Sequence, residues 1–268
     1  MEKSRFEIAQ EAVKLGRACL LGYFGKINHI ESKEKQGLVS EADRTSEEII
    51  KNYLHKHAPE IEFLGEESNY LDRKKMTRQM QGARWILDPL DGTTNYVHRF
   101  PIFCISLGLE VNGVLELGIV DMPMLNQTFT AVRGEGAFCG NERLQVSKTK
   151  NFSDALLSTG FFAEEPGFIE EQLRIFSHFV RIARGIRRPG AAAYDLALVG
   201  AGVFDLFWEK NLKPWDTAAG QLIIEEAGGI VRTYEGLLHH PYEKSLVAGN
   251  PFLVDQFISI IQDLKTKA

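Results

Sequence analysis

The chain has 268 residues, of which 44% are hydrophobic and 25% are charged, proportions that argue against a disordered, collagenous or membrane-spanning protein. Its 31 basic and 36 acidic residues give a formal net charge of -5, so no overall positive field attracts nucleic acid or an acidic membrane surface. The three cysteines are widely spaced, which argues against a disulfide framework or a zinc ribbon and favours a reducing compartment.

The N-terminal segment predicts an amphipathic helix over 3–25, because charged residues between Glu7 and Arg17 recur at helical spacing. The same charges interrupt any apolar stretch typical of a secretory signal. The longest apolar run, 196–204, is far shorter than the ~20 residues needed to cross a bilayer. We therefore expect a cytoplasmic protein that does not act at a membrane.

The next elements are expected to form helix and sheet in turn. A helix is expected over 43–57, with Asp43 as its candidate N-cap. Short buried strands are expected at 61–65 and 85–87, each ending on an acidic loop. Alternation and turn residues then predict an antiparallel meander, with strands at 104–111, 114–121 and 127–132 and turns at 112–113 and 140–141.

After residue 155 the strand and helix signals alternate. Strands are expected at 155–159, 203–208 and 245–249, and helices at 168–183, 191–201, 217–227 and 251–265. Strands in succession followed by strands alternating with helices predict a layered mixed α/β architecture. Because no repeat or flexible linker interrupts the chain, we expect a single domain over 1–268, with an antiparallel half at 1–150 and an α/β half at 151–268.

The most informative stretch is WILDPLDGTTNY at 85–96. A buried strand precedes Asp88, Pro89 keeps Asp88 out of helical geometry, and Asp91 follows three positions after Asp88. Two carboxylates so close together repel each other unless a cation lies between them. The residues from Gly92 to Asn95 supply backbone amides at a predicted helix start, which suits an anion. Cation ligands beside an anion cradle are what metal-assisted phosphoryl transfer requires.

Two further acids have a similar setting. Glu66 follows the predicted strand at 61–65, and Asp216 opens the predicted helix at 217–227. Each of these acids, like Asp88 and Asp91, is compatible with an ordinary turn or N-cap role. Together they favour one site for a hard divalent cation, which takes several oxygen ligands from scattered carboxylates.

At this point the chain resembles the inositol monophosphatases, within the lithium-sensitive, Mg²⁺-dependent sugar-phosphatase superfamily. WILDPLDGTTNYVHRFP at 85–101 is similar to the first family signature, and PWDTAAGQLIIEEAGG at 214–229 to the second. The segments LVSEAD at 38–43, GEES at 65–68 and RRPGAAAYDLALVGAGVFDLFWE at 187–209 match in the same order. The resemblance covers essentially the whole chain. It implies an αβαβα sandwich of the inositol monophosphatase and fructose-1,6-bisphosphatase type, a homodimer, and Mg²⁺-dependent hydrolysis of myo-inositol monophosphate with inhibition by Li⁺.

The resemblance also implies roles for individual residues. One Mg²⁺ would be held by Glu66, Asp88 and the backbone carbonyl of Leu90, a second by Asp88, Asp91 and Asp216, and a weaker third with help from Glu66. Asp43 and Thr93 would orient and deprotonate the attacking water. The phosphate would bind the amides of Gly92, Thr93 and Thr94. The implied substrate contacts further along the pocket are Glu66, Asp91, Gly190, Ala191, Ala192, Glu209 and Asp216. On this assignment the 1–150 half holds most of the metal site.

Several alternatives stay open. No covalent intermediate is implied, because the acids are spaced D-x-x-D rather than D-x-D. The substrate is myo-inositol monophosphate or another phosphate ester of the superfamily: fructose 1,6-bisphosphate, histidinol phosphate or 3'-phosphoadenosine 5'-phosphate. The YVHRFP of 96–101 is similar to the inositol branch, and Thr94 stands where the nucleotide and histidinol branches usually carry lysine. Dual action on inositol and fructose phosphates fits the same site, and a regulatory protein that retains the fold is a rival of another class.

A few positions near the motifs have no settled role. Ala191 stands where the family often has a hydroxyl residue, so one polyol hydrogen bond is missing. Lys33 is a candidate mobile-loop lysine whose register is uncertain. His98 is expected to pack or cap rather than to catalyse. A basic patch of Arg184, Arg187 and Arg188 is expected to be solvated or to contact a second subunit, with phosphate contact as the alternative.

Overall fold

The structure is a computed structural model that describes residues 3–26, 30–33, 37–69, 77–78, 80–161 and 168–266. Its helices are α1 (Arg5–Tyr23), α2 (Glu41–His57), α3 (Glu66–Asn69), α4 (Thr93–Val97), α5 (Phe168–Ile182), α6 (Ala192–Gly200), α7 (Pro214–Glu226) and α8 (Pro251–Thr266). A short antiparallel pair is formed by β1 (Ile30–Lys33) and β2 (Gly37–Ser40). The other described strands form two larger sheets.

The first of these sheets has seven strands in the order β3-β4-β5-β6-β7-β8-β9. The strands are β3 (Glu62–Gly65), β4 (Ala83–Asp91), β5 (Cys104–Val111), β6 (Val114–Met122), β7 (Gln127–Val132), β8 (Gly136–Cys139) and β9 (Glu142–Arg143). Only β3 and β4 run parallel, and the remaining pairs are antiparallel. The hairpin from β5 to β6 turns at Asn112 and Gly113, both with positive φ, as a tight turn matched to the strand twist requires. The meander expected from the sequence is confirmed.

Alternation along β5 decides which helices cover each face of this sheet. Ile105, Leu107 and Leu109 point to the side of α1 and α2 and belong to one core with them. On the opposite face, Gly108 lets α7 pack closely, because a Cβ there would lie 3.0 Å from the Cβ of Ala218. Helices therefore cover both faces of this sheet, with α1 and α2 on the large apolar side chains and α7 on the glycine face.

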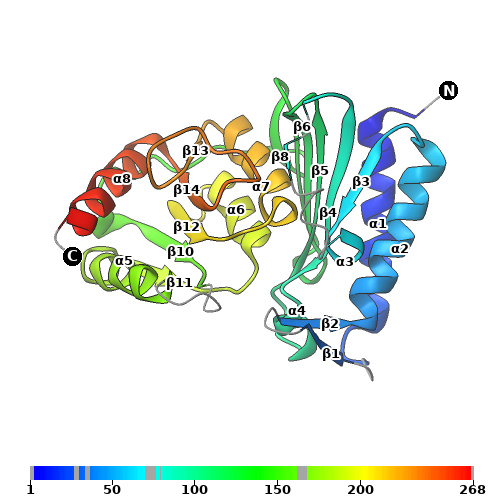
Figure 1. Ribbon diagram of the computed structural model, residues 1–268, viewed down its shortest axis with the longest axis horizontal. Helices are drawn as coiled ribbons and strands as arrows, with labels where there is room; N and C mark the ends of the chain where they lie inside the picture. Colours follow the sequence, from blue (N-terminus) through cyan, green and yellow to red (C-terminus); the bar gives the residue numbers. More distant parts are fainter. Residues whose placement is uncertain are drawn as a thin grey trace.

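The second sheet has five strands in the order β11-β10-β12-β14-β13. They are β10 (Leu156–Thr159), β11 (Gly185–Arg187), β12 (Leu206–Lys210), β13 (Ile230–Arg232) and β14 (Ser245–Gly249). The side chains of Phe207 and Leu246 pack with α6 and α7, whereas Trp208 and Val247 pack with α5 and α8. Figure 1 shows the resulting order of layers, from α1 and α2 through both sheets to α5 and α8. The predicted αβαβα sandwich is confirmed.

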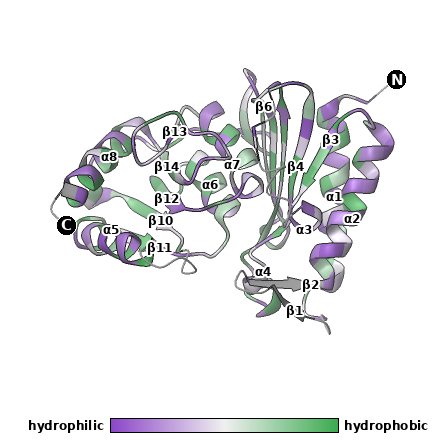
Figure 2. Ribbon diagram, in the orientation of Figure 1, coloured by the Kyte–Doolittle hydropathy of each residue, from purple (hydrophilic) through white to green (hydrophobic). Residues whose placement is uncertain are grey.

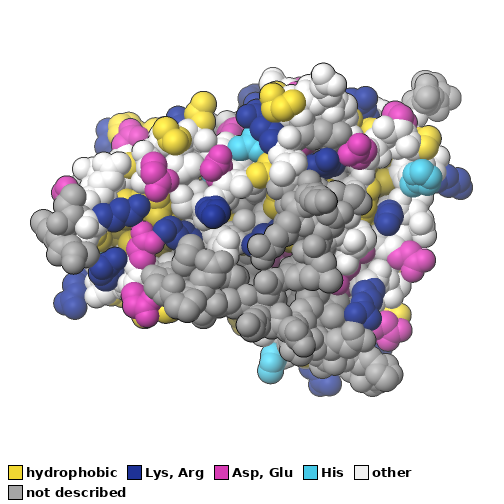
Figure 3. Space-filling view, viewed as in Figure 1, with side chains coloured by type: hydrophobic (Ala, Val, Ile, Leu, Met, Phe, Trp, Pro, Cys, Tyr) yellow, Lys and Arg dark blue, Asp and Glu magenta, His cyan; other side chains and the backbone are white. Residues whose placement is uncertain are grey.

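The surface of this stack is polar and of mixed charge. Figure 2 shows hydrophilic residues along α2 and α5, at the two ends of the stack. On the face drawn in Figure 3, basic and acidic side chains are interspersed over the described residues. In the described part of the chain, no helix combines the length and the apolar character needed to span a membrane.

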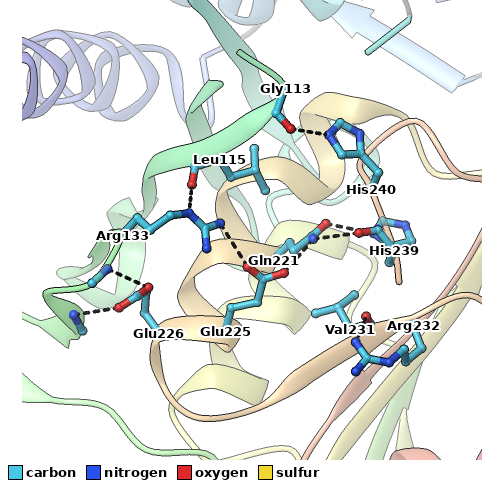
Figure 4. Close-up of polar contacts among 12 residues, drawn as sticks. Gly113, Leu115, Arg133, Gln221, Glu225, Glu226, Val231, Arg232, His239 and His240 are labelled. Carbon is cyan, nitrogen blue, oxygen red and sulfur yellow. Dashed lines mark hydrogen bonds and ion pairs between the residues drawn. The ribbon is translucent and has the colours of Figure 1, made fainter. Parts of the chain in front are cut away.

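A hydrogen-bonded network anchors α7 between the two sheets (Figure 4). Gln221 of α7 donates to the carbonyl of His239 at 3.1 Å, and its Oε1 lies 2.9 Å from His239 Nδ1. Burial lowers the pKa of His239 to about 3, so its ring is neutral. Because the amide oxygen of Gln221 can only accept, Nδ1 is assigned as the donor of their bond. Glu226 accepts the amides of Gly134 and Gly136, both at 2.9 Å. These bonds fix the C-terminal half of α7. Because a helix moves as one body, they also help to position its first turn.

Some element boundaries differ from the prediction. The helix α2 begins at Glu41, so Asp43 is its third residue and not its N-cap. Similarly, α7 begins at Pro214, which puts Asp216 inside the first turn. The strand predicted at 203–208 lies at 206–210, and the one predicted at 85–87 runs from 83 to 91. Pairing with neighbouring strands extends β4 beyond its apolar residues, a tertiary effect that a local pattern does not contain.

Candidate active site

The end of β4 holds two buried carboxyl groups. Asp88 is 2% exposed, and its Oδ1 accepts a hydrogen bond from the amide of Leu90 at 2.9 Å. The pairing of β4 with β5 shifts register between Asp88 and Asp91, where Pro89 has no N–H to donate to a neighbouring strand. Asp91 Oδ2 accepts the amide of Ala193 at 2.6 Å. The first turn of α6 is therefore bound directly to this loop.

Asp216 reaches the same region from α7. Its Oδ2 accepts the amide of Lys213 at 2.6 Å, so the carboxylate closes the first turn of the helix. Ser106 on β5, the register partner of Asp88, donates its hydroxyl to the carbonyl of Trp215 at 2.8 Å. This bond joins the start of α7 to the strand beside Asp88 and brings Asp216 near it.

Glu66 comes from the turn that follows β3. It is partly buried and is the first residue of α3. The turn is held by Glu47 of α2, whose two carboxylate oxygens accept the amides of Glu67 and Ser68, both at 2.8 Å. Gly65 permits this approach, because a Cβ there would lie 2.5 Å from Glu47 Oε2. Glu47 is thus the residue that orients the segment carrying Glu66.

The four acids act on one another through space. Burial raises the pKa of Asp88 well above its ordinary value, and the negative charges of Glu66, Asp91 and Asp216 raise it further. Burial also raises the pKa of Asp91 to about 6, although its hydrogen bond from Ala193 opposes the shift. Carboxyl groups that repel one another in a buried place are stabilised by a cation between them.

The donor set fits a hard divalent cation, because every candidate ligand is an oxygen atom. In the described residues, however, no three His, Cys, Asp or Glu side chains already surround a single ion position. Glu66, Asp91 and Asp216 are nevertheless near enough to raise the pKa of Asp88, and all four carboxyl groups offer the oxygen donors that such an ion takes.

Asp43 and Thr93 lie beside this cluster. Asp43 is 1% exposed, and the hydroxyl oxygen of Thr93 lies 2.8 Å from its Oδ1 and 3.1 Å from the carbonyl oxygen of Leu90. A hydroxyl has one hydrogen, so it donates to one of these oxygens at a time and its lone pairs stay available. Gly92 precedes α4 with φ +92, and a Cβ there would lie 3.0 Å from the carbonyl oxygen of Ile102. Only glycine fits this turn.

A pocket of about 160 Å³ opens next to the acids. Six of the predicted substrate contacts line it: Asp91, Gly190, Ala191, Ala192, Glu209 and Asp216. Burial raises the pKa of Glu209 to about 8, against the attraction of Arg188. A larger cavity of about 990 Å³ lies between α1 and strands β6 to β8, where Arg17 pairs with Asp121 at 3.0 Å, and it includes none of the predicted site residues.

The remaining predicted positions lie in different surroundings. Thr94 and His98 are exposed on and after α4. Ala191 precedes α6 and makes no side-chain capping bond, as expected for a residue without a hydroxyl. The side chain of Lys33 lies outside the described residues. Of the three arginines, Arg184 pairs with Asp154 at 3.0 Å on the surface, Arg187 is exposed on β11, and only Arg188 lines the pocket.

Sequence reasoning missed four residues that shape the site. Glu47 orients α3, and its signal was an acid one helical turn after Asp43 on the apolar face of α2. Asn95 donates its amide to the carbonyls of Ile102 and Pro189, both at 2.8 Å. Asp195, 2% exposed, and Gly160 both line the pocket. No local pattern distinguishes these last two from core residues.

Comparisons with known proteins identify the family of this chain. A sequence profile described as the inositol monophosphatase family matches residues 1–266. The chain belongs to the inositol monophosphatase family. It is 40% identical over 258 residues to the inositol-1-monophosphatase of Rhizobium meliloti (strain 1021), covering 95% of this chain and 94% of that protein.

Other proteins that are similar to this chain are named SuhB. The Nus factor SuhB of Pseudomonas aeruginosa is 39% identical over 238 residues, covering 87% of this chain and 86% of that protein. The crystal structure of the extragenic suppressor protein SuhB from Bartonella henselae superposes with a TM-score of 0.87 at 35% identity, over 96% of this chain and 97% of that one. Membership of the inositol monophosphatase family supports a phosphatase, and such enzymes are generally metal-dependent.

Proposed function

We propose that this protein is a Mg²⁺-dependent phosphatase that hydrolyses myo-inositol monophosphate to inositol and phosphate. The observation that carries the proposal is the convergence of Glu66, Asp91 and Asp216, from three separate segments, on the buried carboxyl of Asp88. A phosphomonoester dianion approaches such a cluster only when metal ions neutralise both. The pocket beside it is small and is lined by groups that accept hydrogen bonds from a polyol.

The metal-binding roles follow from the donor set. Glu66, Asp88 and the carbonyl of Leu90 would hold one Mg²⁺, Asp91 and Asp216 would share a second with Asp88, and Glu66 would help with a weaker third. When bound, the metal supplies Lewis-acid stabilisation of the phosphoryl and leaving-group oxygens and makes hydroxide available near neutral pH. We expect Li⁺ to inhibit by competing at this site.

The chain's own residues orient the reactants. The Asp43 carboxylate accepts from the Thr93 hydroxyl, so Thr93 has its lone pairs directed elsewhere and orients a water molecule for in-line attack. The proton of that water passes to the pair formed by Asp43 and Thr93. The backbone amides of 92–94 bind the phosphate oxygens, because the first N–H groups of a helix have no partner within it.

Substrate recognition uses the other half of the chain. Gly190, Ala191, Ala192, Glu209 and Asp216 contact the polyol, together with Glu66 and Asp91. Because residues before 150 and after 151 contribute to one site, we propose that the two halves form a single domain. The cytoplasmic location stays a prediction. The homodimer, which the family resemblance implies, also stays a prediction, and sedimentation of the purified protein tests it.

The experiment that tests the proposal compares two metal-ligand variants with a surface control. Asp88→Asn and Asp216→Asn each remove a ligand, so each is expected to lower kcat for inositol 1-phosphate by at least about 100-fold. Circular dichroism is expected to show an intact fold, because an amide of the same shape replaces each acid. Asp154→Asn, which affects only an exposed ion pair with Arg184, should leave hydrolysis unchanged. Near-normal hydrolysis by either ligand variant contradicts the proposal.

Hydrolysis rates on four candidate phosphate esters distinguish the possible substrates. Phosphate release with and without Mg²⁺ is measured for inositol 1-phosphate, fructose 1,6-bisphosphate, histidinol phosphate and 3'-phosphoadenosine 5'-phosphate. The proposal expects the highest kcat/KM for the inositol ester, and equal rates on inositol and fructose phosphates indicate dual specificity instead. The rival, a regulatory protein that retains the fold, is favoured by absent hydrolysis together with recovery of a stoichiometric partner.

A further inference from the structure

Arg188 occupies a distinctive place in the pocket beside the acids. Among the described residues that line this pocket, it is the one with a cationic side chain, and the acids there are Asp91, Asp195, Glu209 and Asp216. The neighbouring Arg184 and Arg187 do not line it. The position of Arg188 therefore separates it from the basic patch in which the sequence places it.

The backbone next to Arg188 is held by Asn95, which lies in the segment 85–101. Asn95 donates its side-chain amide to the carbonyl of Pro189 at 2.8 Å, and also to that of Ile102 at 2.8 Å. Gly190 follows with φ +91, and a Cβ there would lie 2.8 Å from Arg188 Nη1. The guanidinium of Arg188 therefore lies against Gly190, a residue that lines the pocket itself.

Glu209 enters the same pocket from β12. A Cβ on Gly160 would lie 2.1 Å from Glu209 Oε2, so the absence of a side chain at 160 is what gives this carboxylate its room. Arg188 is near enough to lower the pKa of Glu209 against the effect of burial. It has the same effect on Asp195, which is 2% exposed in the first turns of α6.

We propose that Arg188 is a substrate-recognition residue whose guanidinium donates hydrogen bonds to a hydroxyl of the leaving group while Glu209 accepts from that hydroxyl. The inference rests on the proposed function, because it assumes that a polyol occupies this pocket. A hydroxyl group both donates and accepts, so a guanidinium and a carboxylate together satisfy it better than either does alone. A charged donor makes these bonds stronger than neutral ones.

The charged side chains that line the pocket also predict which phosphate esters it prefers. Of the described residues that line this pocket, Arg188 is one cationic side chain among four acidic ones, so a second anion on the substrate gains little from it. The pocket therefore favours the monophosphate of an uncharged polyol. It disfavours a bisphosphate, because the second phosphate would lie among acidic side chains, with Arg188 as the one cationic partner among the described lining residues.

The test separates hydroxyl recognition from chemistry. KM and kcat are measured for inositol 1-phosphate and for p-nitrophenyl phosphate, which has no hydroxyl groups, with full-length protein and Mg²⁺. Arg188→Gln is expected to raise KM for inositol 1-phosphate about 10- to 100-fold, to change kcat much less, and to leave both constants for p-nitrophenyl phosphate unchanged. Arg188→Lys, which restores the charge without the guanidinium fork, should recover part of the lost affinity.

The matched controls are Arg187→Gln and Arg184→Gln, which remove the same charge outside the pocket and should leave KM unchanged. An unaltered KM in Arg188→Gln, or an equal effect on both substrates, overturns the inference while the proposed function stands. A selective loss of fructose 1,6-bisphosphate hydrolysis also overturns it, because Arg188 would then bind a second phosphate. If the unmodified protein hydrolyses no polyol monophosphate, the proposed function fails, and the inference fails with it.

Discussion

The pKa of Glu209 depends on burial and on the charged groups near it. It lies on β12, where the missing side chain of Gly160 gives it room beside the backbone. Burial raises its pKa to about 8, Arg188 opposes that shift, and the negative charges of Asp216 and Asp91 add to it. Near neutral pH this group therefore takes up and releases a proton in the folded protein, whereas an ordinary glutamate is fully ionised.

The sign of this shift predicts how stability depends on pH. A carboxyl group with a raised pKa binds its proton more tightly in the folded state, so it stabilises the fold at low pH, and that contribution is lost as pH rises from about 4.5 towards 8. In EDTA-treated protein, Tm is expected to fall over this range, and to fall less in Glu209→Gln. Thermal unfolding at several pH values measures both slopes. Identical slopes for the two proteins contradict the prediction.

The helix α7 is the element on which the site depends most. Its first turn carries Asp216, its middle packs on the glycine face of the seven-stranded sheet, and its last turn accepts hydrogen bonds from the turn between β7 and β8. Gly118 is the closest point of this contact, because a Cβ there would lie 2.7 Å from the carbonyl oxygen of Ala219 and 3.0 Å from its Cα. Backbone atoms within a helix cannot move aside without displacing the helix.

Substitution of Gly118 is therefore expected to disturb both stability and the site. Gly118→Ala should lower the free energy of unfolding by about 1–3 kcal/mol and also reduce kcat, since α7 positions Asp216. Urea unfolding and phosphate release measure the two effects. The control is Gly22→Ala in α1, where a Cβ meets nothing within 4 Å and helix propensity predicts a gain of about 0.5–1 kcal/mol. Equal stabilities for the two variants would falsify this account of the packing.

Across the whole molecule, the acids of the site explain the overall charge. Asp43, Glu66, Asp88, Asp91 and Asp216 together equal the formal net charge of -5. The remaining 31 acidic residues equal the 31 basic residues in number, and on the one face drawn in Figure 3 the two kinds are interspersed over the described residues. The site thus gathers at least as many acids as the net charge counts, and the raised pKa values of Asp88 and Asp91 indicate that these two resist full ionisation without a cation.

Cation binding should consequently stabilise the entire fold. A ligand at 100 times its Kd contributes about 2.7 kcal/mol, which for a chain of this size corresponds to an increase in Tm of roughly 5–10 °C. Mg²⁺ is expected to produce this increase in the unmodified protein and not in Asp88→Asn, whose Tm in EDTA should be equal or higher because a buried repulsive charge is gone. Differential scanning calorimetry measures the four states. An undiminished Mg²⁺ effect in Asp88→Asn contradicts the assigned ligand set.

The amino-acid sequence by itself determined the main elements, the antiparallel meander, the layered α/β class and the family, because these depend on local periodicity, turn residues and ordered motifs. It also named Asp88, Asp91 and Asp216 as one group. Only the tertiary structure decided where β4 ends, that Asp43 and Asp216 lie inside their helices, and that Arg188 alone of three arginines lines the pocket. These features depend on contacts between residues far apart in sequence, such as Asn95 with Pro189, and no local pattern contains that information.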